Sequence, residues 1–298
     1  MNISAAQVKT LRERTGAGMM ECKKSLVEAD GDLEQAVELM RKAGLAKADK
    51  KAGRTAAEGR IALAGDAQAA ALVEVNSETD FVSGGNDFTA FSDTLAELVL
   101  RTRPENLERL AAERLASGET VEEARRVLIA KLGENIGIRR FARYETTGVL
   151  GLYVHGARIG VMVEIEGGDE TLARDIAMHV AASRPACVNP EDVPAETLAG
   201  EREIFRAQAE ASGKPAAIVE KMIEGRLKKY VNEIALTGQP FVKNPDQSVG
   251  ALLKEHGARA LRFARFEVGE GIEKEATDFA AEVRAQVQGT SKNALFSR

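Results

Sequence analysis

The chain has 298 residues, of which 44% are hydrophobic, 29% charged and only 4% aromatic, and its formal net charge is -5. This length predicts two or three domains with cores of Ala, Val, Leu and Ile, and the acidic balance argues against a general nucleic-acid-binding protein. Because no apolar run could span a membrane and no signal peptide is visible, we expect no membrane association and a cytoplasmic location.

Residues 1–45 are predicted to form three short helices. Ser4 and Asp32 are candidate N-caps for the first and third helices, and Gly44 is expected to end the third. Met19 and Met20 are adjacent, so they point to different sides of the second helix and at least one is expected to be partly exposed. Exposed Met suits adaptable protein contacts, and burial of both in the core is the equal alternative.

Residues 46–58 are predicted to link this domain to the next. The stretch from Arg41 to Arg60 holds seven basic and two acidic residues, a local charge of +5. This composition favours a solvated linker or a fraying helix. The alternative is a nucleic-acid-binding module that uses this basic linker, which is less favoured because no aromatic side chains lie nearby to stack on bases.

From residue 59 the pattern changes to two similar halves, 59–146 and 147–268. Each half begins with a predicted β-hairpin, continues with amphipathic helices and ends in a strand. The closing strands contain RFARYE at 140–145 and RFARFE at 262–267, which are identical at five of six positions. We interpret the core as an internal duplication of class α+β, with a small antiparallel sheet and helices on one face in each half.

The second half carries an insertion at about residues 191–230. Two long helical patterns are separated at residues 212–215, and Pro215 suits the first turn of the returning helix. A helical hairpin that projects as an interaction surface is predicted, with packing against the body as the alternative. A homodimer could form through this hairpin or the core. Residues 269–288 are predicted to form a C-terminal amphipathic helix, and residues 289–298 a flexible tail.

No established catalytic or cofactor-binding motif is visible. The chain has no phosphate-binding loop, no dinucleotide-binding fingerprint, and neither CxxC nor HExxH. His155 is expected to be exposed at a hairpin turn, His179 to be packed inside, and His256 to lie at a helix end. No nucleophile accompanies them, so we expect no enzyme activity, no catalytic residue, no metal and no cofactor.

The segment NSETDFV at residues 76–82 directly follows a buried-type strand. From pattern alone the favoured interpretation is a turn capped by Thr79 or Asp80, with Phe81 folded into the core. The functional alternative is an aromatic wedge beside a carboxylate, held on a rigid strand end.

Several motifs together resemble the elongation factor Ts family. Residues 12–23 (RERTGAGMMECK) resemble its N-terminal signature and residues 76–82 its core signature, and residues 155–160, 178–182, 236–241 and 266–272 resemble further motifs in family order. The resemblance implies a guanine-nucleotide exchange factor that acts on elongation factor Tu (EF-Tu), both GDP-bound and nucleotide-free. It also implies a ubiquitin-associated (UBA)-like domain at residues 1–45, a duplicated core, a coiled-coil hairpin and a C-terminal helical module.

The resemblance further implies site residues. The segment Thr79, Asp80, Phe81 and Val82 matches the one that displaces the magnesium ion of EF-Tu, and Asp80 and Phe81 are implied to enter between two partner helices. Further partner contacts are implied at Arg12, Met19, Met20, Lys23, His155, Ile272 and Phe279. Residues 83–85 (SGG) depart from the Ala and charged residues more frequent in the family, and this departure is expected to loosen the loop.

Overall fold

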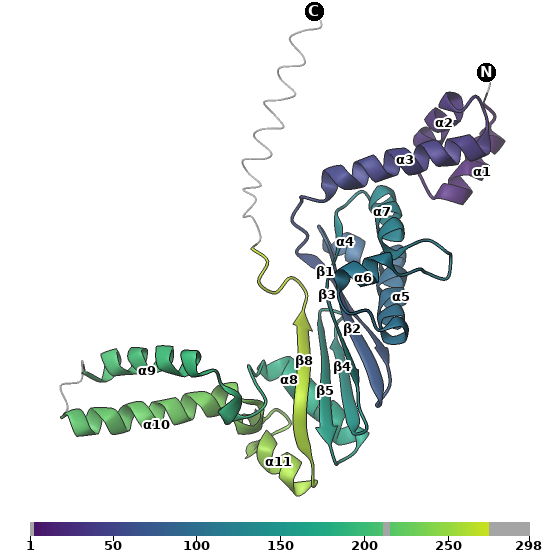
Figure 1. The fold of residues 1–298 in the computed structure, drawn as a ribbon. Helices are drawn as coiled ribbons and strands as arrows, with labels where there is room; N and C mark the ends of the chain where they lie inside the picture. Colours follow the sequence, from purple (N-terminus) through teal and green to yellow (C-terminus); the bar gives the residue numbers. More distant parts are fainter. Residues whose placement is uncertain (1–2, 211–214, 274–298) are drawn as a thin grey trace, which may run out of the picture.

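The computed structural model describes residues 3–210 and 215–273. The chain begins with three helices, α1 (Ala5–Thr15), α2 (Met19–Glu28) and α3 (Leu33–Lys51), as Figure 1 shows. Ser4 forms a capping box with Gln7 at the start of α1, and the Asp32 side chain accepts a hydrogen bond from the Gln35 N–H at the start of α3. A small core that includes Leu11 joins the three helices, which confirms the predicted three-helix segment.

Helix α3 is longer than predicted. It does not end at Gly44 but continues to Lys51, through the first part of the segment expected to be a linker. A Cβ atom at Gly44 would lie 3.0 Å from the Cβ atom of Ala130 on helix α7 (Val121–Leu132). Gly44 therefore allows two helices to approach closely, and its role is packing rather than helix termination. Through this contact the N-terminal helices meet the core (Figure 1).

The first half of the core is a three-stranded antiparallel sheet of order β1-β2-β3, with helices on its outer face. Strands β1 (Glu58–Gly65) and β2 (Ala69–Ser77) form a hairpin, and β3 (Ile136–Glu145) pairs with β2. Between β2 and β3 lie helices α4 (Asp80–Ser83), α5 (Asn86–Thr102), α6 (Leu107–Ala112) and α7. A capping box of Thr120 and Glu123 begins α7.

The second half repeats this plan with sheet order β4-β5-β8. Its strands are β4 (Val149–His155), β5 (Ile159–Glu166) and β8 (Arg259–Glu267), and helices α8 (Glu170–Ser183) and α11 (Val249–Glu255) pack against them. Between α8 and α11 lie two short 3-10 segments, η1 (Pro190–Asp192) and η2 (Leu236–Gly238), and a small hairpin, β6 (Pro240–Phe241) and β7 (Asn244–Ser248).

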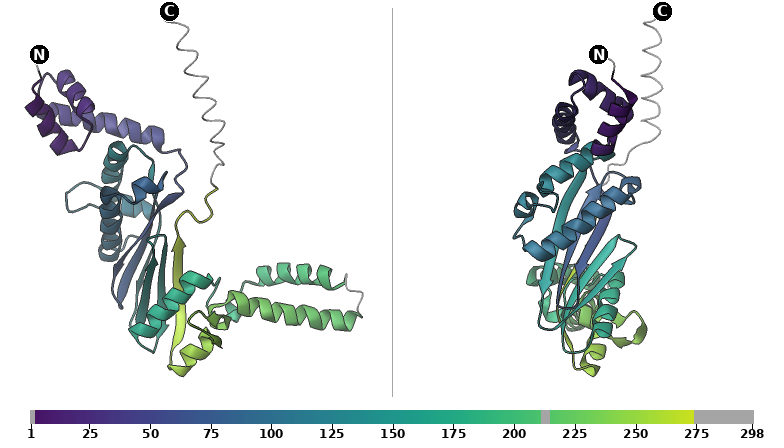
Figure 2. Two further views of the ribbon diagram at one scale, coloured as in Figure 1. Left: turned by 180° about the vertical axis from the view of Figure 1, so that it is seen from behind. Right: turned by 90° about the vertical axis from the view of Figure 1, so that its right-hand side faces the viewer.

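Helices α9 (Ala195–Glu210) and α10 (Ala216–Ile234) form the predicted helical hairpin. Both helices extend away from the two sheets (Figure 2). Pro215 directly precedes α10, as its fixed φ angle favours. The hairpin has its own small apolar core around Ile223, so its two helices are stabilised by each other.

The two sheets pack face to face. Because side chains alternate along a strand, Val73 points to the helices of its own half, whereas Leu72 contacts the other sheet, where Leu150 and Met162 lie. The layers are therefore helix, sheet, sheet, helix. This architecture confirms the α+β class and the internal duplication.

The repeated closing strands exchange contacts between the halves. The guanidinium of Arg140 on β3 lies 4.4 Å from the ring centre of Phe266 on β8, and that of Arg262 on β8 lies 4.1 Å from the ring centre of Tyr144 on β3. The first Arg of each repeated motif therefore lies over the second aromatic ring of the other motif. The RFARYE and RFARFE motifs hold the two halves together as well as closing each sheet.

After β8 the chain turns at residues 268–271, and Ile272 and Glu273 lie outside any helix. The rest of the predicted C-terminal helix, including Phe279, and the predicted tail at 289–298 lie outside the described residues. Within residues 3–210 and 215–273, no helix combines the length and the apolar character that a membrane crossing requires.

Candidate partner-binding surface

The Phe81 loop, residues 79–82, lies between β2 and α5 and exposes an aromatic side chain. Phe81 is 92% exposed, and its neighbour Asp80 is exposed as well. The interpretation favoured by pattern alone, that Phe81 folds into the core, is therefore wrong. An exposed Phe forgoes roughly 1.5–3 kcal/mol of burial free energy, which contact with another molecule could recover.

The base of the Phe81 loop is held by hydrogen bonds. Thr79 is the N-cap of α4, and its hydroxyl accepts from the Val82 N–H at 3.5 Å. Glu134 accepts from the Thr79 N–H at 2.9 Å and from the Thr79 hydroxyl at 2.6 Å. The Ser77 hydroxyl donates to the Thr79 carbonyl at 2.9 Å. The chain is thus fixed immediately before Asp80, while the Phe81 side chain stays exposed.

Residues 83–85 form an ordered turn. The Ser83 hydroxyl and the Gly84 N–H both donate to the Asp80 carbonyl at 3.0 Å, and the Gly85 N–H donates to the Val82 carbonyl at 3.0 Å. Gly84 has φ -83° and Gly85 φ -74°, which are values that any residue adopts. The geometry gives no support to the expectation that this SGG sequence loosens the loop.

A second group of contacts supports the same base. The Asn135 N–H donates to the Glu78 carboxylate at 2.7 Å, and the Asn135 side-chain amide donates to the carbonyls of Ala52 and Arg54 at 3.3 and 2.7 Å. Arg54 also pairs with Glu78 at 3.4 Å. The segment after α3, the turn after α7 and the base of the Phe81 loop are therefore joined to one another.

Four of the residues implied as partner contacts gather on the N-terminal domain. Arg12, Met19, Met20 and Lys23 line one surface pocket of about 400 Å³ beside α1 and α2. Met19 is 59% and Met20 76% exposed, so the alternative in which both pack into the core is wrong. Flexible Met side chains between basic residues suit contact with an acidic, partly apolar surface of another protein.

His155 is exposed at the end of β4, as predicted. Its Nδ1 atom lies 3.1 Å from the Tyr153 hydroxyl. The turn that follows is tied to β1, where Arg158 pairs with Glu58 at 2.8 Å, and Glu58 is in register with Ser77 of β2. His155 and the Phe81 loop therefore lie at the same end of the core, on different halves.

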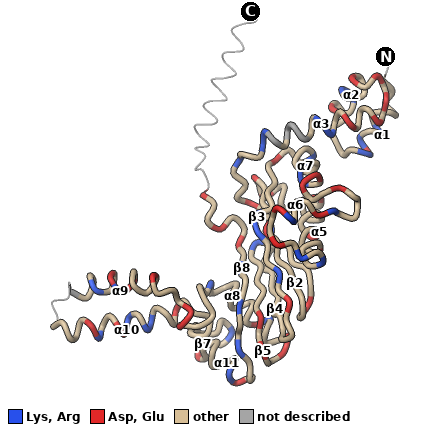
Figure 3. Tube along the Cα trace, viewed as in Figure 1, with Lys and Arg blue, Asp and Glu red and all other residues tan. Residues whose placement is uncertain are grey.

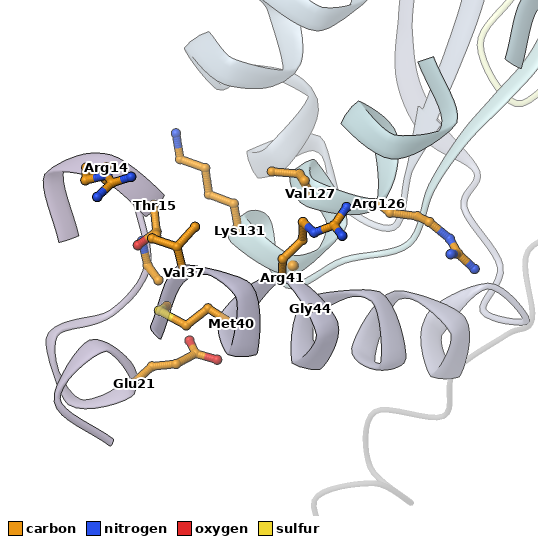
Figure 4. A pocket seen from close by; sticks show the side chains of 12 residues that line it. Arg14, Thr15, Glu21, Val37, Met40, Arg41, Gly44, Arg126, Val127 and Lys131 are labelled. Carbon is orange, nitrogen blue, oxygen red and sulfur yellow. The ribbon is translucent and has the colours of Figure 1, made fainter. Parts of the chain in front are cut away.

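A cavity of about 230 Å³ lies where the N-terminal helices meet the core. Figure 4 shows that Val37, Met40 and Arg41 approach it from α3, and that Val127 and Lys131 approach it from α7. Among the described residues, none of those implied as partner contacts lines this cavity. It belongs to the junction between α3 and α7, and we do not include it in the candidate surface.

The other two histidines have structural positions. His179 is fully buried, accepts at Nδ1 from the Val242 N–H at 3.1 Å, and has Nε2 3.0 Å from the Gln239 side-chain oxygen. Burial lowers its pKa, which favours the neutral ring with a proton on Nε2, and this confirms the predicted packed histidine. His256 is the C-cap of α11, as predicted.

The described residues contain no cluster of three or more His, Cys, Asp or Glu side chains suited to a metal ion. Along the described chain, basic and acidic residues are interspersed in the core and the helical hairpin alike (Figure 3). The features that stand out on this surface are therefore exposed apolar side chains on ordered backbone, a pattern typical of protein–protein contacts.

The comparisons with known proteins give the functional class. Residues 78–270 match the family model described as Elongation factor TS. The chain is 60% identical over 293 residues to elongation factor Ts of Methylococcus capsulatus, covering 97% of this chain and 100% of the relative. It is 60% identical over 290 residues to the Halorhodospira halophila protein (97% and 99%), and 56% identical over 288 residues to that of Legionella pneumophila strain Paris (96% and 99%).

Fold, surface and relatives together define a translation elongation factor. More specifically, the chain belongs to the elongation factor Ts family.

Two residues that hold the Phe81 loop were not identified from the sequence. Glu134 and Asn135 contact residues 55 and 57 positions earlier in the chain, so no local pattern connects them to the loop. The available signal is their place directly after Gly133, the left-handed C-cap of α7 with φ +81°, where the chain changes direction before β3.

Proposed function

We propose that this protein binds EF-Tu·GDP and promotes release of GDP, so that GTP can replace it. Asp80 and Phe81 enter the partner and disturb its Mg²⁺ and phosphate site. The observation that carries the proposal is the 92% exposure of Phe81 on a loop whose base is held by hydrogen bonds. The protein itself breaks no bond in this process, so the proposal requires no catalytic residue.

The physical requirement for such a factor is differential affinity. It accelerates release only if it binds the nucleotide-free partner more tightly than the nucleotide-bound one. The coupling is reciprocal, so GDP must weaken the complex by the same factor by which the protein weakens GDP binding. Separate contacts by the N-terminal pocket, His155 and the Phe81 loop supply binding free energy that offsets the distortion of the partner.

The nucleic-acid alternative has less support. In the basic stretch, Lys42 pairs with Glu38 at 2.9 Å, Arg54 pairs with Glu78, and the Lys51 ammonium donates to the Gly133 carbonyl. These cations already have partners within the chain. The alternative would require RNA binding that persists without EF-Tu and weakens steeply as salt is raised.

The direct test measures release of a fluorescent GDP analogue from EF-Tu at increasing concentrations of this protein. Phe81→Ala is expected to slow the stimulated release by roughly tenfold or more, the size of effect that a buried aromatic contact gives at an interface. Leu107→Ala, which shortens another exposed apolar side chain of the same half, serves as the matched control and is expected to leave release unchanged. Equal release with wild type and Phe81→Ala would contradict the proposal.

A further inference from the structure

We propose that Glu134 is a positioning residue for nucleotide exchange, because it fixes the direction in which the Phe81 loop leaves the core. This inference rests on the function proposed above and adds to it a residue outside the loop. Glu134 lies just after α7, and it is separated from Thr79 by 55 positions in the sequence.

The first step is the geometry at Thr79. The two carboxylate oxygens of Glu134 accept different hydrogens of the same residue, Oε2 from the N–H at 2.9 Å and Oε1 from the hydroxyl at 2.6 Å. Two bonds to one residue set its orientation as well as its position, and bonds to an ionised acceptor are stronger than neutral ones. Thr79 is the N-cap of α4, so its orientation sets that of the helical turn that carries Phe81.

The second step is the support of Glu134 itself. The neighbouring Asn135 is buried, and its N–H donates to Glu78 at 2.7 Å. Glu134 thus reaches Thr79 while Glu78 reaches Asn135, and two adjacent contacts run in opposite directions between the same two segments. A pair of such contacts resists both rotation and sliding of one segment against the other.

The third step is that Phe81 cannot be positioned by burial. Since 92% of its surface is exposed, packing against the protein contributes little to its placement. The placement must come from the backbone bonds within α4 and from the base at Thr79. A loop that is ordered before it meets its partner loses less conformational entropy on binding.

The test is a double-mutant cycle on the stimulated release of the GDP analogue from EF-Tu. The variants of the full chain are Glu134→Ala, Phe81→Ala and the combination of both. The matched control is Glu123→Ala, because Glu123 accepts from the N–H and the hydroxyl of Thr120 at 2.9 and 3.1 Å. That control removes similar bonds at the opposite end of α7. Glu134→Gln, which keeps the shape but offers one acceptor oxygen, is the conservative variant.

We expect Glu134→Ala to slow release about fivefold and Glu123→Ala to change release less than about twofold. The release rate with Glu134→Gln should lie between the rates with Glu134→Ala and with wild type. In the Phe81→Ala background, Glu134→Ala should slow release less than it does when Phe81 is present, because only Asp80 is then left to position.

Two results would overturn the inference: wild-type release with Glu134→Ala, or the same slowing by Glu134→Ala whether or not Phe81 is present. Unchanged release with Phe81→Ala is a different result, since it would refute the proposed function and this inference with it. Unfolding curves show whether each variant is folded, and Glu134→Gln provides the same comparison if Glu134→Ala is not.

Discussion

The two halves of the core share a hairpin, covering helices and a closing strand, but they carry their additional structure in different places. In the first half, residues 78–85 join β2 to α5 and contain α4 with the Phe81 loop. In the second half, only residues 167–169 join β5 to α8, and the addition is the α9–α10 hairpin between α8 and α11. This difference indicates that the repeated unit serves as a scaffold, and that the segments connecting its strands and helices supply the exposed surfaces.

The halves also differ at an equivalent acid. Glu74 of β2 and Glu164 of β5 each lie next to a register shift and opposite the first Arg of the repeated motif. Glu74 is fully buried and accepts from Arg140 at 2.6 Å and from the Gly269 N–H at 2.9 Å, whereas Glu164 is 7% exposed and accepts from Arg262 at 2.5 Å. Only Glu74 therefore also anchors the chain that follows β8.

The largest expected effect comes from removing these charges. Glu74→Gln should lower the free energy of unfolding by roughly 3 kcal/mol, because it leaves the cations of Arg139 and Arg140 without their buried anion. Glu164→Gln should cost about 1 kcal/mol, since Arg262 is half exposed and water replaces the lost contact. Urea unfolding of both variants measures the difference, and equal losses would show that the two acids are equivalent after all.

Protonation by acid should test the contacts of Glu74 by a second route. Burial alone would raise the pKa of Glu74, but the hydrogen bonds from Gly269, Arg140 and Arg139 outweigh it and hold the pKa below its usual 4.5. A carboxyl whose pKa is lower in the folded protein contributes stability above pH 4.5, and loses it as the pH falls through the folded pKa. Unfolding free energy measured from pH 6 down to pH 3 should therefore fall less steeply for Glu74→Gln than for wild type; identical slopes would contradict this assignment.

The exchanged ring contacts should behave alike in the two halves. Phe266→Leu removes the ring beneath Arg140, and Tyr144→Leu removes the ring beneath Arg262. Each should cost about 1 kcal/mol of unfolding free energy, because a partly desolvated cation–π contact is lost in both cases. Thermal unfolding of both variants in the same buffer compares the two losses of stability. A much larger loss of unfolding free energy for one variant would show that the two halves are equivalent in their backbone but not in these side-chain contacts.

The two connections should respond to an added methyl group in opposite directions, and the smallest expected effect is at Gly84. Gly168 has φ +72°, and a Cβ there would lie 2.8 Å from a Leu172 methyl, so Gly168→Ala should destabilise by roughly 1–2 kcal/mol. Gly84 has φ -83° and room for a Cβ, so Gly84→Ala should stabilise by about 0.5 kcal/mol. Chemical unfolding distinguishes the signs. If Gly84→Ala also slowed nucleotide exchange, the Phe81 loop would need freedom that its hydrogen bonds do not suggest.

Much of the architecture follows from local sequence pattern. The hairpins, the capped helices and the repeated closing strands each depend on residues close together in the chain, and they formed as predicted. The end of α3 did not, because Gly44 is normally a stop signal and its packing against Ala130 depends on a residue far along the chain. A contact between helices that are far apart in the sequence produces no recurring pattern of residues around either contact position.

The candidate surface was harder to predict for the same reason. Pattern alone favoured a buried Phe81, since most Phe side chains next to a strand pack inside. Its exposure depends on Thr79 beginning a new helical turn, and on Glu134 holding Thr79 from another segment. The family resemblance marked the loop as a candidate site, but it gave no indication of Glu134.

The main-chain contacts between the halves also come in matched pairs. The Ile61 N–H of β1 donates to the Ala157 carbonyl at 2.7 Å, and the Leu150 N–H of β4 donates to the Ala67 carbonyl at 2.8 Å. In each case an N–H of the first strand of one half donates to a carbonyl in the hairpin turn of the other half. The isologous interface of a two-fold homodimer has the same reciprocal pattern. The core can thus be regarded as a dimer made within one chain. A true homodimer must change both copies at once, whereas covalent fusion lets one copy acquire the Phe81 loop and the other the helical hairpin.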